Sequence, residues 1–320
     1  MTYQCHIIKF RKGQYLQFNE YLKTCRERYS LTQEQLVQEL YNSSDEFSGL
    51  TTGTLGRWER GATHPNLSKQ VGIVKVFQKY STHLFPCFYD QDKIEDELCR
   101  VGIKNLIGHS KVHVLKFPTN VFTVDDIKVS HVRSHKDIAF MLKMPVSILN
   151  GITSNEFKIE VEQLTSWALH PTSLFVVAEC DGQFFGMFFA LRLKPDVFKK
   201  IISLEMHIHD ITEDDFASFE EEACSLPFSF FAYNEKTASL LYIRYYAHLI
   251  ANQNSILEVG TTPLLDEGRK VVKSMHLTHL HDKVIEKGTL SAYSAPLEDV
   301  LINEDVLRMV FRKQECTEEE

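Results

Sequence analysis

The chain has 320 residues, of which 43% are hydrophobic, and a net charge of −8 at pH 7. This length and apolar content are typical of a globular protein with two domains. The overall negative charge excludes attraction of the whole surface to nucleic acid.

Cysteine usage and the distribution of apolar residues indicate the cellular compartment. Seven cysteines, none of them in a Cys-x-x-Cys pair, are typical of reduced thiols rather than of a disulfide framework. The amino terminus lacks the charged and apolar regions of a secretory signal, and no run approaches the roughly 18 apolar residues of a membrane span. We therefore expect a soluble, cytoplasmic protein that makes no contact with a membrane.

Charge is unevenly distributed along the chain. Residues 1–80 contain 11 Lys and Arg against 7 Asp and Glu, whereas the remainder contains 24 against 36. The first part therefore has a net charge of +4 and the remainder −12. A basic partner-binding surface is expected only near the amino terminus.

Residues 1–80 are expected to form an all-α domain. Apolar residues recur there at helical spacing, separated by residues that cap or end helices. We expect four short helices, at Tyr15 to Arg28, from Ser30 or Thr32 to Tyr41, from Thr51 or Thr52 to Arg60, and after Pro65, where Leu67, Val71, Val74 and Phe77 face inward.

Three short motifs lie in a fixed order along these helices. They are Leu31-Thr32-Gln33, Trp58-Glu59-Arg60-Gly61 and Pro65, followed by an amphipathic helix. This compound pattern resembles the Cro/repressor-like helix-turn-helix family, often called the XRE family, over about a quarter of the chain. The resemblance implies binding of double-stranded DNA, with the second helix of the motif in the major groove.

Eight residues match DNA-contacting positions of that family. Gln33 corresponds to a phosphate contact, the start of the third helix and Arg57 to base contacts, and Arg60 and Lys69 to contacts with the DNA backbone. The implied DNA-binding residues are Gln33, Thr51, Thr52, Gly53, Thr54, Arg57, Arg60 and Lys69. Leu55 and Trp58 are expected to pack inward.

One departure from the family pattern is the length of the loop before the third helix. Residues 42–49 form a polar loop of about twice the usual length, and its acidic residues Asp45 and Glu46 would repel phosphates. We expect the loop tip to point away from DNA. The alternative is a four-helix module that binds another protein, with Arg57 and Arg60 solvated.

The remainder of the chain alternates strands with helices. We expect a linker at 81–120 with a helix at Lys93 to Ile107, an α/β domain with a central mixed sheet at 121–314, and a short acidic tail at 315–320. The expected strands and helices are strands at 111–117, 126–132, 174–193 (a hairpin turning at Asp181-Gly182), 227–233 and 255–261, and helices at 136–149, 160–169, 235–251 and 264–275.

From about Asp125 onward, this order of elements resembles the GCN5-related N-acetyltransferase (GNAT) fold. Working members have a glycine-rich loop whose amides bind the pyrophosphate of acetyl-CoA. The matching stretch, Tyr233 to Leu240, contains no glycine, and no tyrosine corresponds to the general acid of the family. The resemblance therefore implies a degenerate domain for dimerisation or effector sensing, with no cofactor and no catalytic residue.

Histidine pairs and an acidic run raise further alternatives. His207-Ile208-His209 and His276, His279 and His281 have spacings that permit metal ligation, but no carboxylate or cysteine cluster accompanies them. We assign no metal site. Asp210 to Ala223 is predicted to be an acidic, solvated helix.

Together these patterns predict a DNA-binding transcriptional regulator rather than an enzyme. Its acidic second domain would form a homodimer, bind a small-molecule effector, or both. The alternative is a GNAT-type N-acetyltransferase with an amino-terminal helical docking domain.

Overall fold

A computed structural model describes most of the chain, namely residues 17–80, 85, 91–103, 127–152, 158–286 and 288–311. The chain divides into two compact units, residues 1–112 with 301–320, and residues 113–300. The sequence predicted that 301–314 belong to the second domain, whereas in the structure the described residues 301–311 group with the first. The expected strand at 111–117 lies outside the described residues.

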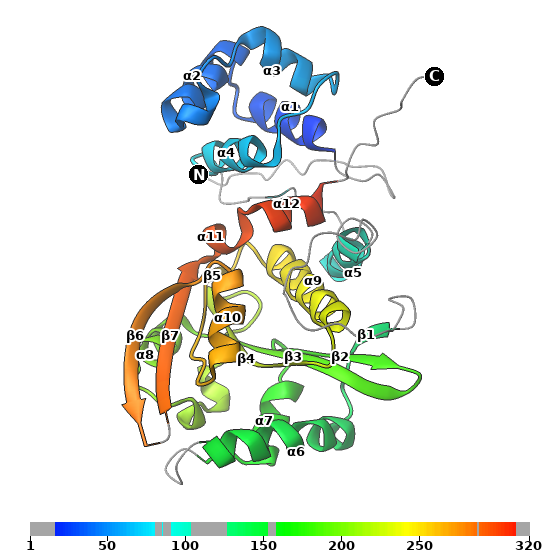
Figure 1. Cartoon of the computed structure of the whole chain (residues 1–320), viewed down its shortest axis with the longest axis vertical. Coiled ribbons are helices and arrows are strands. Elements are labelled where there is room, and N and C mark those ends of the chain that lie inside the picture. The colour runs from blue at the N-terminus through cyan, green and yellow to red at the C-terminus, as the bar shows by residue number, and fades with distance from the viewer. Residues whose placement is uncertain are drawn as a thin grey trace. The chain divides into compact units, whose positions relative to one another are not determined.

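The described part of the first unit is helical. It contains α1 (Phe18–Arg28), α2 (Gln33–Ser43), a 3-10 turn (Asp45–Phe47), α3 (Thr52–Glu59), α4 (Leu67–Gln78), α5 (Gln91–Gly102) and α12 (Glu304–Val310). The four helices expected before residue 80 are thus present (Figure 1). Thr32, Thr51 and Asn66 cap three of them through their side chains, as such residues commonly do.

Aromatic rings join the carboxyl-terminal helix to the amino-terminal ones. The Phe311 ring, directly after α12, lies 5.1 Å from the Phe18 ring and 5.2 Å from the Tyr21 ring, centroid to centroid. All three side chains are buried. Burial of such large rings explains why residues after 300 belong to the first unit.

The loop between α2 and α3 is anchored rather than free. Phe47 is only 1% exposed and its ring packs so closely on Gly72 of α4 that a Cβ there would approach it to 2.8 Å. The acidic Asp45 and Glu46 are exposed, and Glu46 accepts a hydrogen bond from the Ser68 hydroxyl. The lengthened loop therefore has a packing role.

The second unit is built on one mixed sheet. Its strands are β1 (Ile127–His131), β2 (Leu174–Cys180), β3 (Gln183–Leu193), β4 (Ala223–Ala232), β5 (Ile256–Thr261), β6 (Thr278–Ile285) and β7 (Gly288–Pro296). Its helices are α6 (His135–Ile152), α7 (Val161–Leu169), α8 (Pro195–Ile202), α9 (Glu235–Ala251), α10 (Asp266–Ser274) and α11 (Leu297–Leu301), the last of which ends at the boundary between the units.

The seven strands lie in the order β1-β2-β3-β4-β5-β7-β6. Among the described strands, only β4 and β5 pair in parallel, and α9 connects them. In Figure 1, α6 and α7 lie on one face of the sheet and α9 lies on the opposite face. The expected mixed sheet with helices is confirmed.

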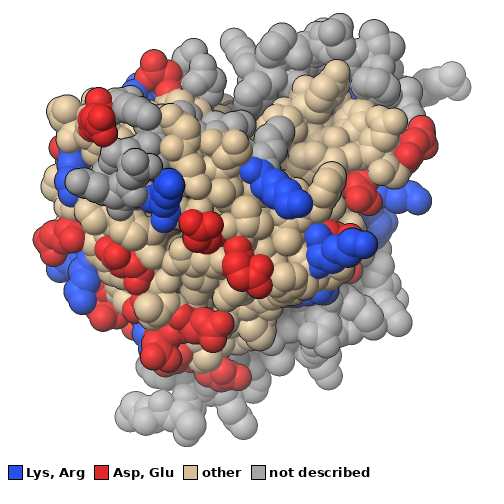
Figure 2. All heavy atoms as spheres, turned by 90° about the horizontal axis from the view of Figure 1, so that it is seen from below, with Lys and Arg blue, Asp and Glu red and all other residues tan. Residues whose placement is uncertain are grey.

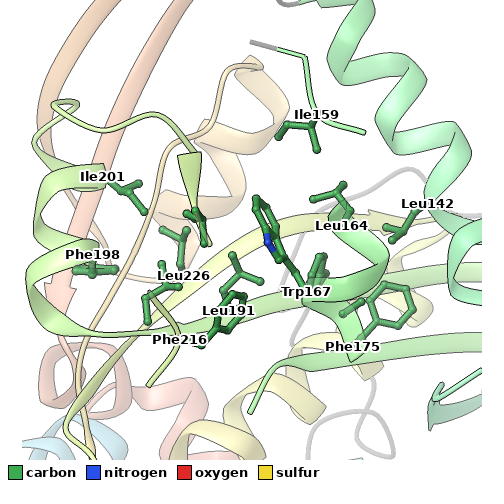
Figure 3. Packing of buried hydrophobic residues seen from close by; sticks show 14 of the residues in the cluster. Leu142, Ile159, Leu164, Trp167, Phe175, Leu191, Phe198, Ile201, Phe216 and Leu226 are labelled. Carbon is green, nitrogen blue, oxygen red and sulfur yellow. The ribbon is translucent and has the colours of Figure 1, made fainter. Parts of the chain in front are cut away.

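A large apolar core lies between the sheet and the helices α6, α7 and α8. Figure 3 shows Leu142, Leu164, Trp167 and Phe198 directed toward the same interior as Phe175 and Leu191 of the sheet. All of these side chains are at most 2% exposed. α8 was not expected from the sequence, yet it contributes four buried residues to this core.

The hairpin of β2 and β3 follows the sequence signal closely. Asp181 and Gly182 have φ values of 49° and 73°, as a two-residue turn of the I′ type requires. Further along β3, Gly186 faces β4 so closely that a Cβ would lie 2.5 Å from the carbonyl oxygen of Phe231. Only a residue without a side chain fits there.

Gly186→Ala is expected to destabilise the second unit by about 1–3 kcal/mol, because a backbone oxygen must move. Gly151→Ala is the matched control, since nothing lies within 4 Å of a Cβ at that helical position. Denaturant unfolding of both variants checks this prediction. Equal stability of the two variants would contradict it.

The acidic helix predicted for Asp210 to Ala223 is wrong. The segment forms two 3-10 turns, Ile208–Asp210 and Glu213–Asp215, and then leads into β4. Buried Arg192 of β3 binds this segment by donating hydrogen bonds to the carbonyl oxygens of Ser218 (3.0 Å) and Glu221 (2.8 Å). These carbonyl groups are thereby held in a non-helical conformation. The strands β6 and β7 were also missed.

Candidate active site

The sheet opens between its two parallel strands. The last paired residues are Ser225 and Val259, although β4 continues to Ala232. Pro227 follows the last pair and has no N–H to donate, and the pairing of β4 with β3 is irregular at the same point. Across the opening, the Thr261 hydroxyl donates a hydrogen bond of 2.6 Å to the Pro227 carbonyl oxygen.

A cavity of about 500 Å³ lies at this opening. Residues 227–232 of β4 and residues 261–265, at and after the end of β5, line it. It reaches both faces of the sheet, because Ile159, Leu164 and Ile201 of the core side line it (Figure 3), as does Tyr242 of α9. Crevices at the carboxyl ends of neighbouring parallel strands are common ligand sites in α/β proteins.

The amino terminus of α9 lies at the same end of β4. Asn234 follows the strand and caps the helix, with its Oδ1 accepting a hydrogen bond of 2.8 Å from the Thr237 amide. The Asn234 Nδ2 and the Thr237 hydroxyl are buried and have no hydrogen-bond partner among the described residues. The first N–H groups of a helix and unsatisfied donors both favour an anion.

Tyr233 and Asn234 stand between the end of β4 and the first turn of α9. The Tyr233 side chain is 65% exposed, and the Asn234 side chain is turned back onto the helix. Lys236, which is also exposed, adds positive charge beside that turn.

Two histidines line the cavity wall after α8. The rings of His207 and His209 are nearly parallel, at 12°, with centroids 5.4 Å apart. Asp210 contacts both residues: its Oδ2 accepts from the His207 amide at 3.3 Å, and its Oδ1 lies 3.3 Å from His209 Nε2. Gln163 of α7 fixes the segment by donating to the His209 carbonyl oxygen at 2.8 Å.

The rest of the cavity wall is mostly apolar. None of its described lining residues is Asp or Glu, and Lys283 is the only one with a permanent charge. Burial raises the pKa of Tyr242 well above its usual value, so that its hydroxyl keeps its proton. An imidazole beside a carboxylate in an apolar cavity is suited to accept a proton.

The residues predicted to bind DNA lie in the first unit. Gln33 donates a hydrogen bond of 2.6 Å from its Nε2 to Glu59 Oε2, so its amide is engaged within the protein. Arg57 and Arg60 are exposed, and Lys69 lies 6.0 Å from the centre of the Trp58 ring. The four residues at the start of α3, Thr51, Thr52, Gly53 and Thr54, are exposed or half-buried. Leu55 and Trp58 pack inward as expected.

The structure separates the two histidine groups considered as metal ligands. His279 is exposed on β6 and pairs with Asp282 at 3.0 Å, whereas His207 and His209 line the cavity. Within the described ranges, no group of three or more His, Cys, Asp or Glu residues is placed to hold a metal ion. Within the same ranges, no helix is both long and apolar enough to cross a bilayer.

Among known proteins, similarity to this chain was found in solved structures. No protein-family model and no curated protein sequence matches this chain. A solved N-acetyltransferase from Staphylococcus aureus Mu50 covers 53% of this chain and 98% of its own, with 10% identity and a TM-score of 0.37. The ribosomal-protein-alanine N-acetyltransferase from Brucella melitensis covers 53% and 99%, with 12% identity and a TM-score of 0.35.

A third similar structure covers the same share of this chain. The polyamine N-acetyltransferase from Drosophila melanogaster covers 53% of this chain and all of its own, with 10% identity and a TM-score of 0.37. The second unit itself has the GNAT-like α/β arrangement, with seven strands in a mixed sheet and a parallel pair at its centre.

These findings correct the functional prediction. The three similar structures described above bear the names of N-acetyltransferases, and nothing in the comparisons supports an XRE helix-turn-helix domain or a DNA-binding transcriptional regulator. The prediction of a DNA-binding, non-enzymatic regulator is thus contradicted. In Figure 2, basic side chains are interspersed with acidic ones on the coloured part of the face. The homodimer, the effector and the DNA contacts of the eight amino-terminal residues stay predictions.

Sequence reasoning missed two signals for this site. Pro227 lies within an apolar run that was expected to be a strand, and a proline inside a central strand marks a break in its pairing. The second signal is the His207-Ile208-His209 motif, which was considered only for metal binding. Both signals lie close to the cavity that the fold creates.

Proposed function

We propose that the second unit is an acyltransferase that moves an acyl group from a CoA thioester to an amine. The observation that carries this proposal is the cavity at the opening between β4 and β5, next to the amino terminus of α9. The helix terminus suits the phosphates of CoA, and the gap in the sheet suits its extended thioester arm.

The residues present fit a CoA thioester as substrate. The Asn234 amide and the Thr237 hydroxyl are buried donors without a partner among the described residues, and a bound phosphate would satisfy such groups. The exposed ammonium of Lys236 adds attraction for the same charge. These groups would hold the nucleotide part of the donor.

His209 is the candidate general base. In the proposed reaction the amine nitrogen attacks the thioester carbon, the C–N bond forms and the C–S bond breaks. The proton of the amine passes to His209, and the thiolate leaves with CoA. Asp210 orients the imidazole and stabilises its protonated form through the 3.3 Å contact.

Binding of a CoA thioester to the full-length chain tests this function directly. We expect acetyl-CoA to bind with one site per chain in isothermal titration calorimetry. Asn234→Ala is expected to weaken binding about 5- to 20-fold, because it removes a donor near the phosphates and the helix cap. Asn303→Ala, which removes the cap of α12 in the first unit, is the matched control. Absence of any binding would overturn the proposal.

A further inference from the structure

We infer that the cavity accepts a medium-chain aliphatic acyl group, such as octanoyl, on the CoA thioester. The inference rests on the proposed acyltransferase function and names its substrate class. It depends on three properties of the cavity, namely its apolar wall, its volume and its lack of carboxylates.

The wall offers apolar side chains that nothing in the described chain fully covers. Leu204, Met206 and Ile208 pack against the core but are only partly buried, and all three line the cavity. On α10, Val271 and Val272 line it as well. An aliphatic chain would remove this apolar surface from water, which is favourable in proportion to the area covered.

The volume exceeds what an acetyl group needs. At about 500 Å³, the cavity lies in the range of about 300–1,000 Å³ that holds complete small-molecule ligands. With only an acetyl group bound, the apolar wall that is formed by the segment after α8 and by α10 would stay in contact with water. A longer chain extending from the opening at β4 would fill this space.

The charge of the wall disfavours a cationic ligand in the same place. No described lining residue carries a carboxylate, and Asp210 behind the wall is already paired with His209, so a polyamine would lose hydration without a free ionic partner. The Lys283 ammonium would repel such a ligand further. An uncharged hydrocarbon chain has neither cost.

Calorimetry with acetyl-CoA, octanoyl-CoA, free octanoate and octylamine on the full-length chain tests this inference. Six additional methylene groups are expected to tighten binding of octanoyl-CoA over acetyl-CoA by at least about 10-fold, after the cost of ordering the chain. Equal affinities of the two thioesters would overturn the inference. Tight binding of octylamine without any preference for octanoyl-CoA would assign the aliphatic chain to the amine acceptor. This result would also overturn the inference.

A charged variant tests where in the cavity the octanoyl chain binds. Met206→Glu places a carboxylate in the apolar wall and is expected to abolish the preference for octanoyl-CoA, whereas Met206→Leu is expected to keep it. Leu257→Glu adds the same charge at a residue that is 43% exposed and outside the cavity lining, so it should keep the preference. Loss of the preference in Leu257→Glu, or its retention in Met206→Glu, would contradict the assigned position.

The two proposals fail in different ways. If no CoA thioester binds but octanoate binds and Met206→Glu weakens it at least 10-fold, the acyltransferase proposal fails and the aliphatic site stands as a site for a free fatty acid. If both thioesters bind equally and octanoate does not bind, the acyltransferase proposal stands, and the inference that the cavity accepts a medium-chain acyl group fails.

Discussion

His209→Ala is expected to lower kcat/KM for acyl transfer by about 10²- to 10⁴-fold, the usual contribution of a general base. The imidazole lines the cavity and is oriented by Asp210, with Nε2 3.3 Å from Oδ1. Without it, the amine must lose its proton to water. A steady-state assay of released CoA thiol measures the effect.

Rescue by added imidazole distinguishes a proton acceptor from a structural residue. Free imidazole that diffuses into the enlarged cavity is expected to restore part of the rate in His209→Ala. The control is His281→Ala, since His281 is exposed on β6 and outside the cavity lining. Full activity of His209→Ala would remove His209 from the mechanism, and loss without rescue would assign it a structural role.

The second large effect is expected from Glu59→Ala in the first unit. The Glu59 side chain is 5% exposed and accepts hydrogen bonds from Arg26 Nε and, at 3.2 Å, from Arg26 Nη2. Gln33 donates to the same carboxylate. These hydrogen bonds raise the pKa of Arg26. Removing the carboxylate leaves a largely buried guanidinium with only the Leu31 carbonyl oxygen, at 2.9 Å, and the exposed Glu27 as partners, which costs about 3–4 kcal/mol.

Hydrogen exchange measured separately over α1 and α3 reports this loss within the first unit. Exchange by unfolding is expected to accelerate roughly 10²- to 10³-fold in Glu59→Ala. Glu39→Gln is the control, because Glu39 and Lys79 form an exposed pair at 3.5 Å that contributes less than about 1 kcal/mol. Similar exchange in the two variants would show that the buried pair does not hold the helices together.

Most local elements followed from short patterns. The apolar-rich run at residues 235–251 predicted α9 with the bounds that the structure has, and Asp181-Gly182 predicted the hairpin turn. Such features depend on residues close together in the chain. The acidic run after Asp210 failed because its conformation depends on Arg192, a residue in another strand that binds its carbonyl groups.

The functional site was harder to predict than the elements that form it. The absence of glycine at the start of α9 disfavours catalysis, whereas the structure places this helix terminus after the end of β4 that lines the cavity. The two histidines were noticed as a pair, but their position on a cavity wall depends on α8, which was not expected from the sequence.

The amino-terminal helices with their caps, the hairpin and the mixed nature of the second unit could be predicted from the sequence, because each depends on the stereochemistry of neighbouring residues. The separation of β4 and β5 around a cavity and the return of the chain to the first unit after residue 300 became visible only in the folded chain. Both features depend on packing between residues that lie far apart in the chain, and no local pattern specifies such packing.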